Sequence, residues 1–304
     1  MDELFVTYET YHQPFRQPLQ TSHGIWAARS GVIVTLQSSD GRTGKGEIAP
    51  LEWFGSESLA AAIAFCAGLN GQITREAIFG ISDCLPCCQF AFEMALMGLE
   101  IAPPLSKGAG GDQIAALLPT GKAAIDTWQS LYKSGSRTFK WKIGVQAIVD
   151  ELALFQDLHQ QLPTDCQLRL DANAGLDWSQ AKQWLDCLED YSIEYLEQPL
   201  DIQSFMQMQT LCKTYSTSIA LDESISNLAS LANCYHQGWR GIYVIKPAIV
   251  GSPKRLQEFI QRHPIDTVFS SVFETAIGYT AGLELGIALG STRAFGYGTK
   301  DWWS

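Results

Sequence analysis

The strongest constraint on the fold is an alternation of short apolar strands and amphipathic helices that begins near residue 114. Apolar runs bounded by turn residues predict seven strands, at 114–118, 138–143, 167–171, 193–197, 218–222, 242–246 and 267–271. Strands that alternate with helices of this size form right-handed βαβ units and a parallel sheet. Seven such strands in one series favour a closed α/β barrel. An open doubly wound sheet is the alternative, but no glycine-rich phosphate loop follows the first strand.

The helices between these strands carry apolar residues at the 3.6-residue period. Asp177 and Gln180 have the spacing of a capping box and predict the start of a helix whose apolar stripe includes Trp184. Ser252 and Pro253 predict the start of another helix. These signals define the length of each βα unit.

The first 110 residues have a different pattern, which predicts an α+β module over the mouth of the barrel. Strands are expected at 3–11 and 30–39, with a turn at 40–46 after the second. Helical segments are expected around 57–68 and 86–101. The Pro- and Gly-rich stretch 102–112 separates the two parts, so we predict a capping domain at 1–107 and a barrel at 108–291.

Composition excludes several classes of function. The chain has 304 residues, 46% of them hydrophobic, and a formal net charge of −11, which argues against a nucleic-acid partner. The first ten residues lack the apolar core of a signal peptide, and the late apolar stretch 276–290 is too short to span a bilayer. We therefore expect a cytoplasmic protein without membrane insertion. The oligomeric state is left open.

Eight cysteines are scattered along the chain. Cys84 and Cys87 have the spacing of a zinc or redox motif, but no second pair completes such a site. Buried free thiols are the expected reading.

The run TFKWKIGV, residues 138–145, places two lysines in an otherwise apolar strand. Because side chains alternate along a strand, Lys140 and Lys142 should lie on the same face. Two unpartnered ammonium groups cannot be buried cheaply. The strand is either on the surface or part of a site that uses a lysine as a base.

Charged or polar residues recur at the C-terminal ends of six predicted strands, where barrel enzymes place their active sites. The positions are Lys142, Asp171, Glu197, Asp222, Lys246 and Ser271, separated by 29, 26, 25, 24 and 25 residues. Each of these residues alone is compatible with an ordinary structural role, such as a turn, a helix cap or a solvated strand end. Their recurrence at one point of a structural repeat favours a shared site.

The chemistry of this set is consistent with metal-assisted proton abstraction. Asp171, Glu197 and Asp222 would offer hard oxygen ligands suited to Mg²⁺. A divalent cation can stabilise the enediolate that forms when a proton leaves the carbon next to a carboxylate. A lysine acts as the base when neighbouring cations favour its neutral form, and Lys140 together with the metal would do this for Lys142.

The chain resembles the enolase superfamily, in its muconate-lactonizing-enzyme-like subgroup. Five short motifs carry the resemblance in order: Lys140-x-Lys142, Asp171-x-Asn173, Glu197-Gln-Pro, Asp222-Glu223-Ser and Lys246-Pro. The segments GKGEIAPLEWFGSESL (44–59) and FSSVFETAIG (269–278) are similar to those of the branch that makes an aromatic succinylbenzoate for menaquinone or phylloquinone biosynthesis.

This resemblance implies a (β/α)7β barrel with an α+β cap that the last residues, from about 292 to 304, rejoin. It implies Mg²⁺, with Mn²⁺ as a substitute, bound by the three carboxylates. The implied reaction is a syn β-elimination of water from 2-succinyl-6-hydroxy-2,4-cyclohexadiene-1-carboxylate. Lys142 would remove the α-proton and Lys246 would stay cationic.

Further residues are expected to assist this chemistry. Lys140, Asn173 and Glu223 would be supporting residues. Ser270 and Ser271 are candidates for binding the substrate's distal carboxylate, although an ordinary strand-end role is as good a reading. The segments 21–31 and 50–58 are expected to close over the barrel mouth.

Other activities are compatible with the same motifs. Relatives racemise N-acylamino acids, epimerise dipeptides or open and close lactones. Dipeptide epimerases carry an Asp-x-Asp near the last barrel strand, where this chain has FGYGTKDWWS (295–304). A Schiff-base lyase would need one lysine and no carboxylate triad, and a non-catalytic barrel would not need this charged set.

Overall fold

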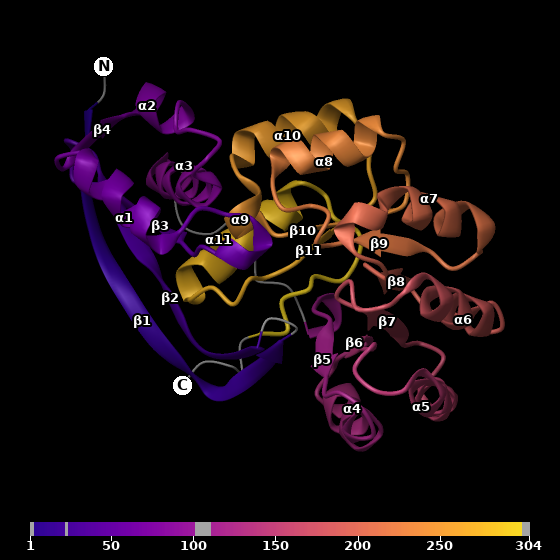
Figure 1. The fold of residues 1–304 in the computed structure, drawn as a ribbon. Helices are drawn as coiled ribbons and strands as arrows, with labels where there is room; N and C mark the ends of the chain where they lie inside the picture. The colour runs from indigo at the N-terminus through magenta and orange to yellow at the C-terminus, as the bar shows by residue number, and fades with distance from the viewer. Residues whose placement is uncertain (1–2, 22–23, 101–110, 300–304) are drawn as a thin grey trace.

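The computed structural model describes residues 3–21, 24–100 and 111–299 and has two packed parts (Figure 1). The first is an antiparallel sheet of four strands in the order β3-β2-β1-β4, covered by helices. Its strands and helices are β1 (Glu3–Thr21), β2 (Gly24–Gln37), β3 (Thr43–Ile48), the 3₁₀ turn η1 (Glu52–Phe54), α1 (Leu59–Gly68), β4 (Gln72–Thr74), α2 (Arg75–Phe79) and α3 (Pro86–Glu100).

The second part is a curved parallel sheet of seven strands in sequence order. The strands are β5 (Ala116–Leu118), β6 (Thr138–Lys142), β7 (Gln167–Asp171), β8 (Tyr195–Glu197), β9 (Ile219–Leu221), β10 (Ile242–Ile245) and β11 (Thr267–Phe269). The helical segments are η2 (Gly111–Gln113), α4 (Ala123–Lys133), α5 (Ile148–Gln161), α6 (Trp178–Leu188), η3 (Ile202–Ser204), α7 (Phe205–Thr214), α8 (Leu228–His236), α9 (Pro247–Val250), α10 (Pro253–Arg262) and α11 (Ala276–Ala288). The α/β barrel prediction is confirmed, and the predicted strands overlap the observed ones.

The barrel is closed by a short segment after α11. The backbone N–H of Phe295 donates a hydrogen bond to the carbonyl of Gln113, and the carbonyl of Phe295 accepts one from the N–H of Ala115. Both donor–acceptor distances are 2.8 Å, and both bonds lie beside β5. Gly296 bonds on its other side to Phe269 and Ser271 at the end of β11. This segment forms isolated parallel bridges instead of a full strand, so apolar periodicity does not reveal it.

The cap differs from its prediction in the length of its strands. β1 and β2 form a long hairpin whose register shifts between Pro14 and Leu19. β3 already begins at Thr43, inside the expected turn. Gly44 and Gly46 let the backbone of β3 approach α3, because a Cβ at either position would overlap the α3 backbone. The predicted boundary between the parts lies in residues 101–110, outside the described residues.

Carboxylates of the cap hold it on the barrel by accepting hydrogen bonds from backbone at helix starts. Glu47 on β3 accepts from the backbone N–H groups of Thr275 (2.9 Å) and Gly278 (2.8 Å), at the start of α11. Glu93 on α3 accepts from the N–H of Lys254 at 3.0 Å, in the first turn of α10. An anion at a helix N-terminus satisfies unpaired N–H groups and is stabilised by the helix dipole.

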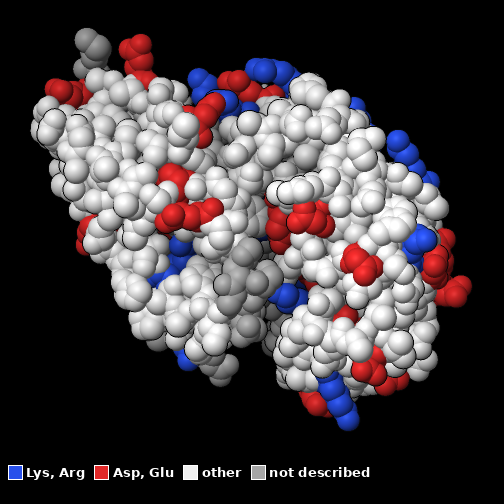
Figure 2. Space-filling view, viewed as in Figure 1, with Lys and Arg blue, Asp and Glu red and all other residues white. Residues whose placement is uncertain are grey.

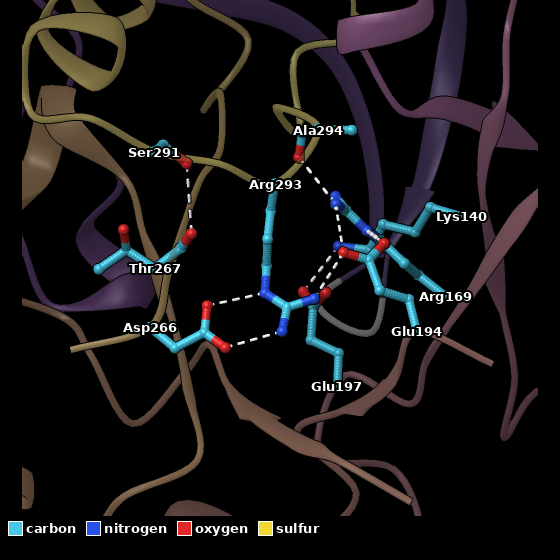
Figure 3. A network of polar contacts seen from close by, with 9 residues as sticks. All are labelled: Lys140, Arg169, Glu194, Glu197, Asp266, Thr267, Ser291, Arg293 and Ala294. Atoms are coloured by element: carbon cyan, nitrogen blue, oxygen red, sulfur yellow. Dashed lines mark hydrogen bonds and ion pairs between the residues drawn. The ribbon is translucent and has the colours of Figure 1, made fainter.

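At the N-terminal end of the barrel, four charged side chains form a network (Figure 3). Arg169, buried on β7, pairs with Glu194 at 2.6 Å. Arg293 bridges Glu194 (2.8 Å) and Asp266 (2.7 Å). Barrel residues at this end serve stability, whereas the chemistry of barrel enzymes lies at the opposite end.

Three further predictions concern the surface charge, membrane-spanning helices and the cysteines. On the face shown in Figure 2, the Lys and Arg side chains of the described residues are scattered among acidic ones and form no continuous basic patch. No helix within the described ranges is long and apolar enough to cross a membrane. All eight cysteines are free, but only four are buried, and Cys84 is exposed, so the expectation of buried thiols is wrong for that residue.

Candidate active site

On strands β8 to β11, the barrel interior has a hydrophobic layer below a polar C-terminal end. Tyr195, Ala220, Ile242, Val244 and Val268 form a separate buried cluster inside the sheet. Because side chains alternate along each strand, the residues two positions further along the same face lie at the C-terminal mouth. Glu197 lies two positions after Tyr195, and Asp222 lies two positions after Ala220, so both acidic side chains are expected at the C-terminal mouth.

Strand pairing brings the predicted polar residues together. Lys142 on β6 is the register partner of Asp171 on β7, and Asp171 is the partner of Glu197 on β8. Asp222 and Lys246 directly follow β9 and β10. The structure therefore places the two lysines and three carboxylates at one end of the barrel.

Lysine ammonium groups lie against these carboxylates. Lys140 is 2.8 Å from Asp171 Oδ2 and 2.6 Å from Glu197 Oε1, and Figure 3 shows it beside Glu197. Lys246 pairs with Asp222. Lys140 is expected from the sequence to favour the neutral form of Lys142. In the structure, its ammonium group instead forms ion pairs with two buried carboxylates, Asp171 and Glu197.

Burial and mutual charge perturb the acids and Lys140 strongly. Burial, with the neighbouring charge of Asp171, raises the pKa of Glu197 well above its ordinary value. Burial acts on Asp171 as well, but the charge and hydrogen bond of Lys140, the backbone N–H of Asn173 and the charge of Lys142 together lower the pKa of Asp171. Burial opposes the charge on Lys140, yet Asp171 and Glu197 raise its pKa. Burial, followed by the charge of Asp222, raises the pKa of Glu223 to about 7.

The buried side-chain oxygens without a hydrogen-bond partner among the described residues include Oε2 of Glu197 and Oε2 of Glu223. Leaving a buried acceptor unpaired is costly unless a ligand engages it. In the described part of the chain, no three acidic, His or Cys side chains converge closely enough to hold an ion as they stand. The ammonium groups of Lys140 and Lys246 contact the acids instead.

Two amide side chains shape the loops at this mouth. Asn173 donates from Nδ2 to Glu223 Oε1 at 3.2 Å, and its φ is 42°. Gln198, fully buried, accepts from the backbone N–H of Asp222 at 3.0 Å and donates to Ser224 Oγ at 3.0 Å. The sequence alone does not indicate this role of Gln198, although Gln198 lies between Glu197 and Pro199 in the Glu197-Gln-Pro motif.

The charged cluster opens into a cavity of about 390 Å³ between barrel and cap. Trp26 lines it from one predicted cap segment, and Leu51, Trp53 and Phe54 line it from the other. The Phe54 ring centroid lies 4.2 Å from Lys246 Nζ. Both predicted cap segments thus contribute residues to the pocket wall. Residues 22–23 of the first segment lie outside the described residues.

Ser270 and Ser271 also line the cavity, but their hydroxyls are engaged within the protein. Ser270 donates to the carbonyl of Gly296 at 3.3 Å. Ser271 donates to Glu274 and accepts from the N–H of Phe273 at 2.9 Å and the hydroxyl of Thr299 at 3.1 Å. Ser271 therefore holds the loop that follows β11, and Glu274 and Thr299 are contributors that the sequence did not reveal.

Comparison with known proteins gives two family matches and close relatives. Residues 123–303 match the family described as enolase C-terminal domain-like, and residues 6–99 match the MenC N-terminal domain. An o-succinylbenzoate synthase of Thermosynechococcus vestitus is 38% identical over 97% of this chain and 92% of its own length. A hydrophobic dipeptide epimerase of Roseobacter litoralis is 26% identical over 92% of this chain and 87% of its own length.

A solved structure has the same architecture. The crystal structure of o-succinylbenzoate synthase from Thermosynechococcus elongatus BP-1, complexed with Mg in its active site, matches with a TM-score of 0.93 and 38% identity. The match covers 99% of this chain and 94% of that one. With a barrel and a cap that each match a family, this chain belongs to the enolase superfamily.

Proposed function

We propose that this chain is an o-succinylbenzoate synthase, a hydro-lyase that removes water from the cyclohexadiene substrate in cytoplasmic menaquinone or phylloquinone biosynthesis. The observation that carries the proposal is one apolar-walled cavity that Lys142, Lys246, Asp171 and Asp222 line at its charged end. Glu197 is buried on the strand between those of the two aspartates. Similarity to o-succinylbenzoate synthases over both cap and barrel supports the same substrate.

Asp171, Glu197 and Asp222 would hold the magnesium ion, with manganese as a substitute. The donor set fits, because all three are carboxylates on adjacent strand ends and Glu197 Oε2 lacks a partner among the described residues. When bound, the ion would offset the negative charge that develops on the substrate carboxylate. Lys140 would remain as a cation beside Asp171 and Glu197.

Lys142 would take the proton from the ring carbon next to the carboxylate and return it to the departing hydroxide, which leaves as water. Such a syn elimination needs one acid–base group on one face of the ring. Lys246 would face the opposite side as a fixed cation, with the Phe54 ring beside it. Asn173 and Glu223 would support the loop that carries the metal ligands.

The direct test is turnover of the cyclohexadiene substrate by the purified protein with Mg²⁺, followed by the loss of diene absorbance. Racemisation of an N-acylamino acid, assayed in parallel by loss of optical rotation, measures the alternative activity of this superfamily. Borohydride trapping with substrate would reveal a Schiff-base enzyme. No loss of diene absorbance at any Mg²⁺ concentration would reject the proposed function.

A further inference from the structure

The loop after β11 forms one wall of the cavity and has a strained backbone. Ser271, Val272 and Phe273 all line the cavity. Phe273 has a φ of 61°, in the left-handed region that a bulky side chain rarely adopts. Such a conformation persists only where surrounding contacts impose it. The contacts that hold this loop therefore decide the shape of the pocket.

One of these contacts comes from a buried arginine of the cap. Arg29 on β2 is 3% exposed. Its Nε donates to the carbonyl of Val272 at 3.2 Å, and Nη1 donates to the carbonyls of Ser30 (3.1 Å) and Pro50 (2.7 Å). Nη2 donates to the carbonyl of Ala49. Four of the five guanidinium N–H donors are thus directed at backbone carbonyls.

These carbonyls belong to three of the segments that form the pocket walls. Pro50 leads directly into Leu51–Phe54, which lines the cavity from the cap. Val272 belongs to the strained barrel loop. Trp26, three residues before Arg29 on β2, lines the third side, and its ring centroid is 5.5 Å from Arg29 Cζ.

Aromatic contacts join the same segments on the side of the cavity. The Trp26 ring lies 5.5 Å from the Phe273 ring and 6.3 Å from the Trp53 ring, measured between centroids. A change at the guanidinium would therefore displace side chains that face the substrate.

We propose that Arg29 is a positioning residue that sets the shape of the substrate pocket by tying three of its wall segments together. This inference rests on the proposed function for the identity of the substrate. Arg29 touches no reacting atom and acts through the walls. Only a guanidinium can do this, because its planar fork reaches acceptors in several directions, whereas a lysine ammonium is a single point of charge.

The test compares Arg29→Lys with Arg293→Lys. Arg293 is also an arginine with several partners, but it lies at the other end of the barrel, bound to Glu194 and Asp266. We expect Arg29→Lys to raise KM about tenfold and to lower kcat by a smaller factor, because the walls contact the substrate away from the reacting carbon. Arg293→Lys should lower the melting temperature and leave KM unchanged.

Two further measurements separate positioning from general stability. Binding of the product, o-succinylbenzoate, to each variant is measured by calorimetry and should weaken only in Arg29→Lys. Added methylguanidinium should restore part of the lost kcat/KM in Arg29→Ala and have no such effect on Arg293→Ala. An unchanged KM and product affinity in folded Arg29→Lys would overturn the inference.

Loss of the folded state in both Arg29→Lys and Arg29→Ala would also overturn it, because Arg29 would then serve global stability. These failures are distinct from failure of the proposed function. If the unmodified protein does not turn over the cyclohexadiene substrate, the function itself is wrong. If it does and the Arg29 variants match it, only the positioning role is rejected.

Discussion

At the residue scale, two lysines with the same charge have different surroundings. Lys142 lies beside Asp171 on the neighbouring strand, whereas Lys246 pairs with Asp222 and faces the Phe54 ring. A proton-transfer group must be able to lose its charge, and an electrostatic group must keep it. Lys246 is therefore the residue that we propose as the electrostatic group.

Substitution by arginine should separate these roles. Lys142→Arg should be as inactive as Lys142→Ala, because a guanidinium cannot act as a base near neutral pH. Lys246→Arg should retain more activity than Lys246→Ala, since it keeps a cation. Steady-state kinetics on all four variants measures this. Substantial turnover by Lys142→Arg, with none by Lys246→Arg, would reverse the assignment.

The three carboxylates should each be essential. Asp171→Ala, Glu197→Ala and Asp222→Ala should lose activity by at least about 100-fold, because each removes an oxygen ligand of a metal that stabilises developing charge. Circular dichroism should show that the fold is kept. EDTA should silence the unmodified enzyme and Mg²⁺ should restore it, so full activity after removal of divalent metals would contradict the proposed site.

Ser271 should act through the loop it holds. Ser271→Ala leaves the buried carboxyl of Glu274 without its donor, which should cost about 1–3 kcal/mol of unfolding free energy. It also frees the N–H of Phe273 and should raise KM more than it lowers kcat. Urea unfolding and steady-state kinetics test the two effects, and wild-type values in both would exclude this role.

At the element scale, strands and helices were largely predictable from local patterns. The capping box of Asp177 and Gln180 begins α6 as its spacing predicts. The Lys140 contacts were not predictable, because they depend on the register of β6, β7 and β8, which no local pattern states. The hydroxyl partners of Ser271 come from Glu274 and Thr299, and the latter belongs to a segment without strand periodicity.

Glu47 joins one element of the cap to one helix of the barrel. Its carboxylate accepts from Thr275 and Gly278 at the start of α11 and from the Tyr11 hydroxyl at 2.5 Å. Burial, with the charge of Glu47, raises the pKa of Tyr11. Glu47→Gln should therefore lose about 1–3 kcal/mol of unfolding free energy, because an amide NH₂ cannot accept from these donors.

Chemical denaturation followed by tryptophan fluorescence measures that loss. Glu52→Gln is a matched control, since Glu52 is exposed on the cap turn η1 and should leave stability within about 0.5 kcal/mol. Equal midpoints for the two variants would show that Glu47 does not hold the cap on α11.

At the scale of the whole molecule, the barrel depends on the short closing segment at Phe295 and Gly296. A Cβ at Gly296 would lie 2.7 Å from Ser270 Oγ and 3.0 Å from its Cβ. Gly296→Val should therefore force the closing segment away from β11 and cost about 1–3 kcal/mol. Urea unfolding measures the loss. Gly68→Ala, where nothing lies within 4 Å, is the control, and similar midpoints for both variants would contradict this account.

The position of the closing segment late in the chain also means that the barrel can close only after almost all of its strands and helices have been synthesised. Until residues 295 and 296 have been synthesised, β5 and β11 keep backbone edges open toward each other. Open edges of an incomplete sheet pair readily with other chains. A chain whose closing segment has not yet paired therefore has an open, aggregation-prone barrel, and binding of chaperones should fall once residues 295 and 296 pair with β5 and β11.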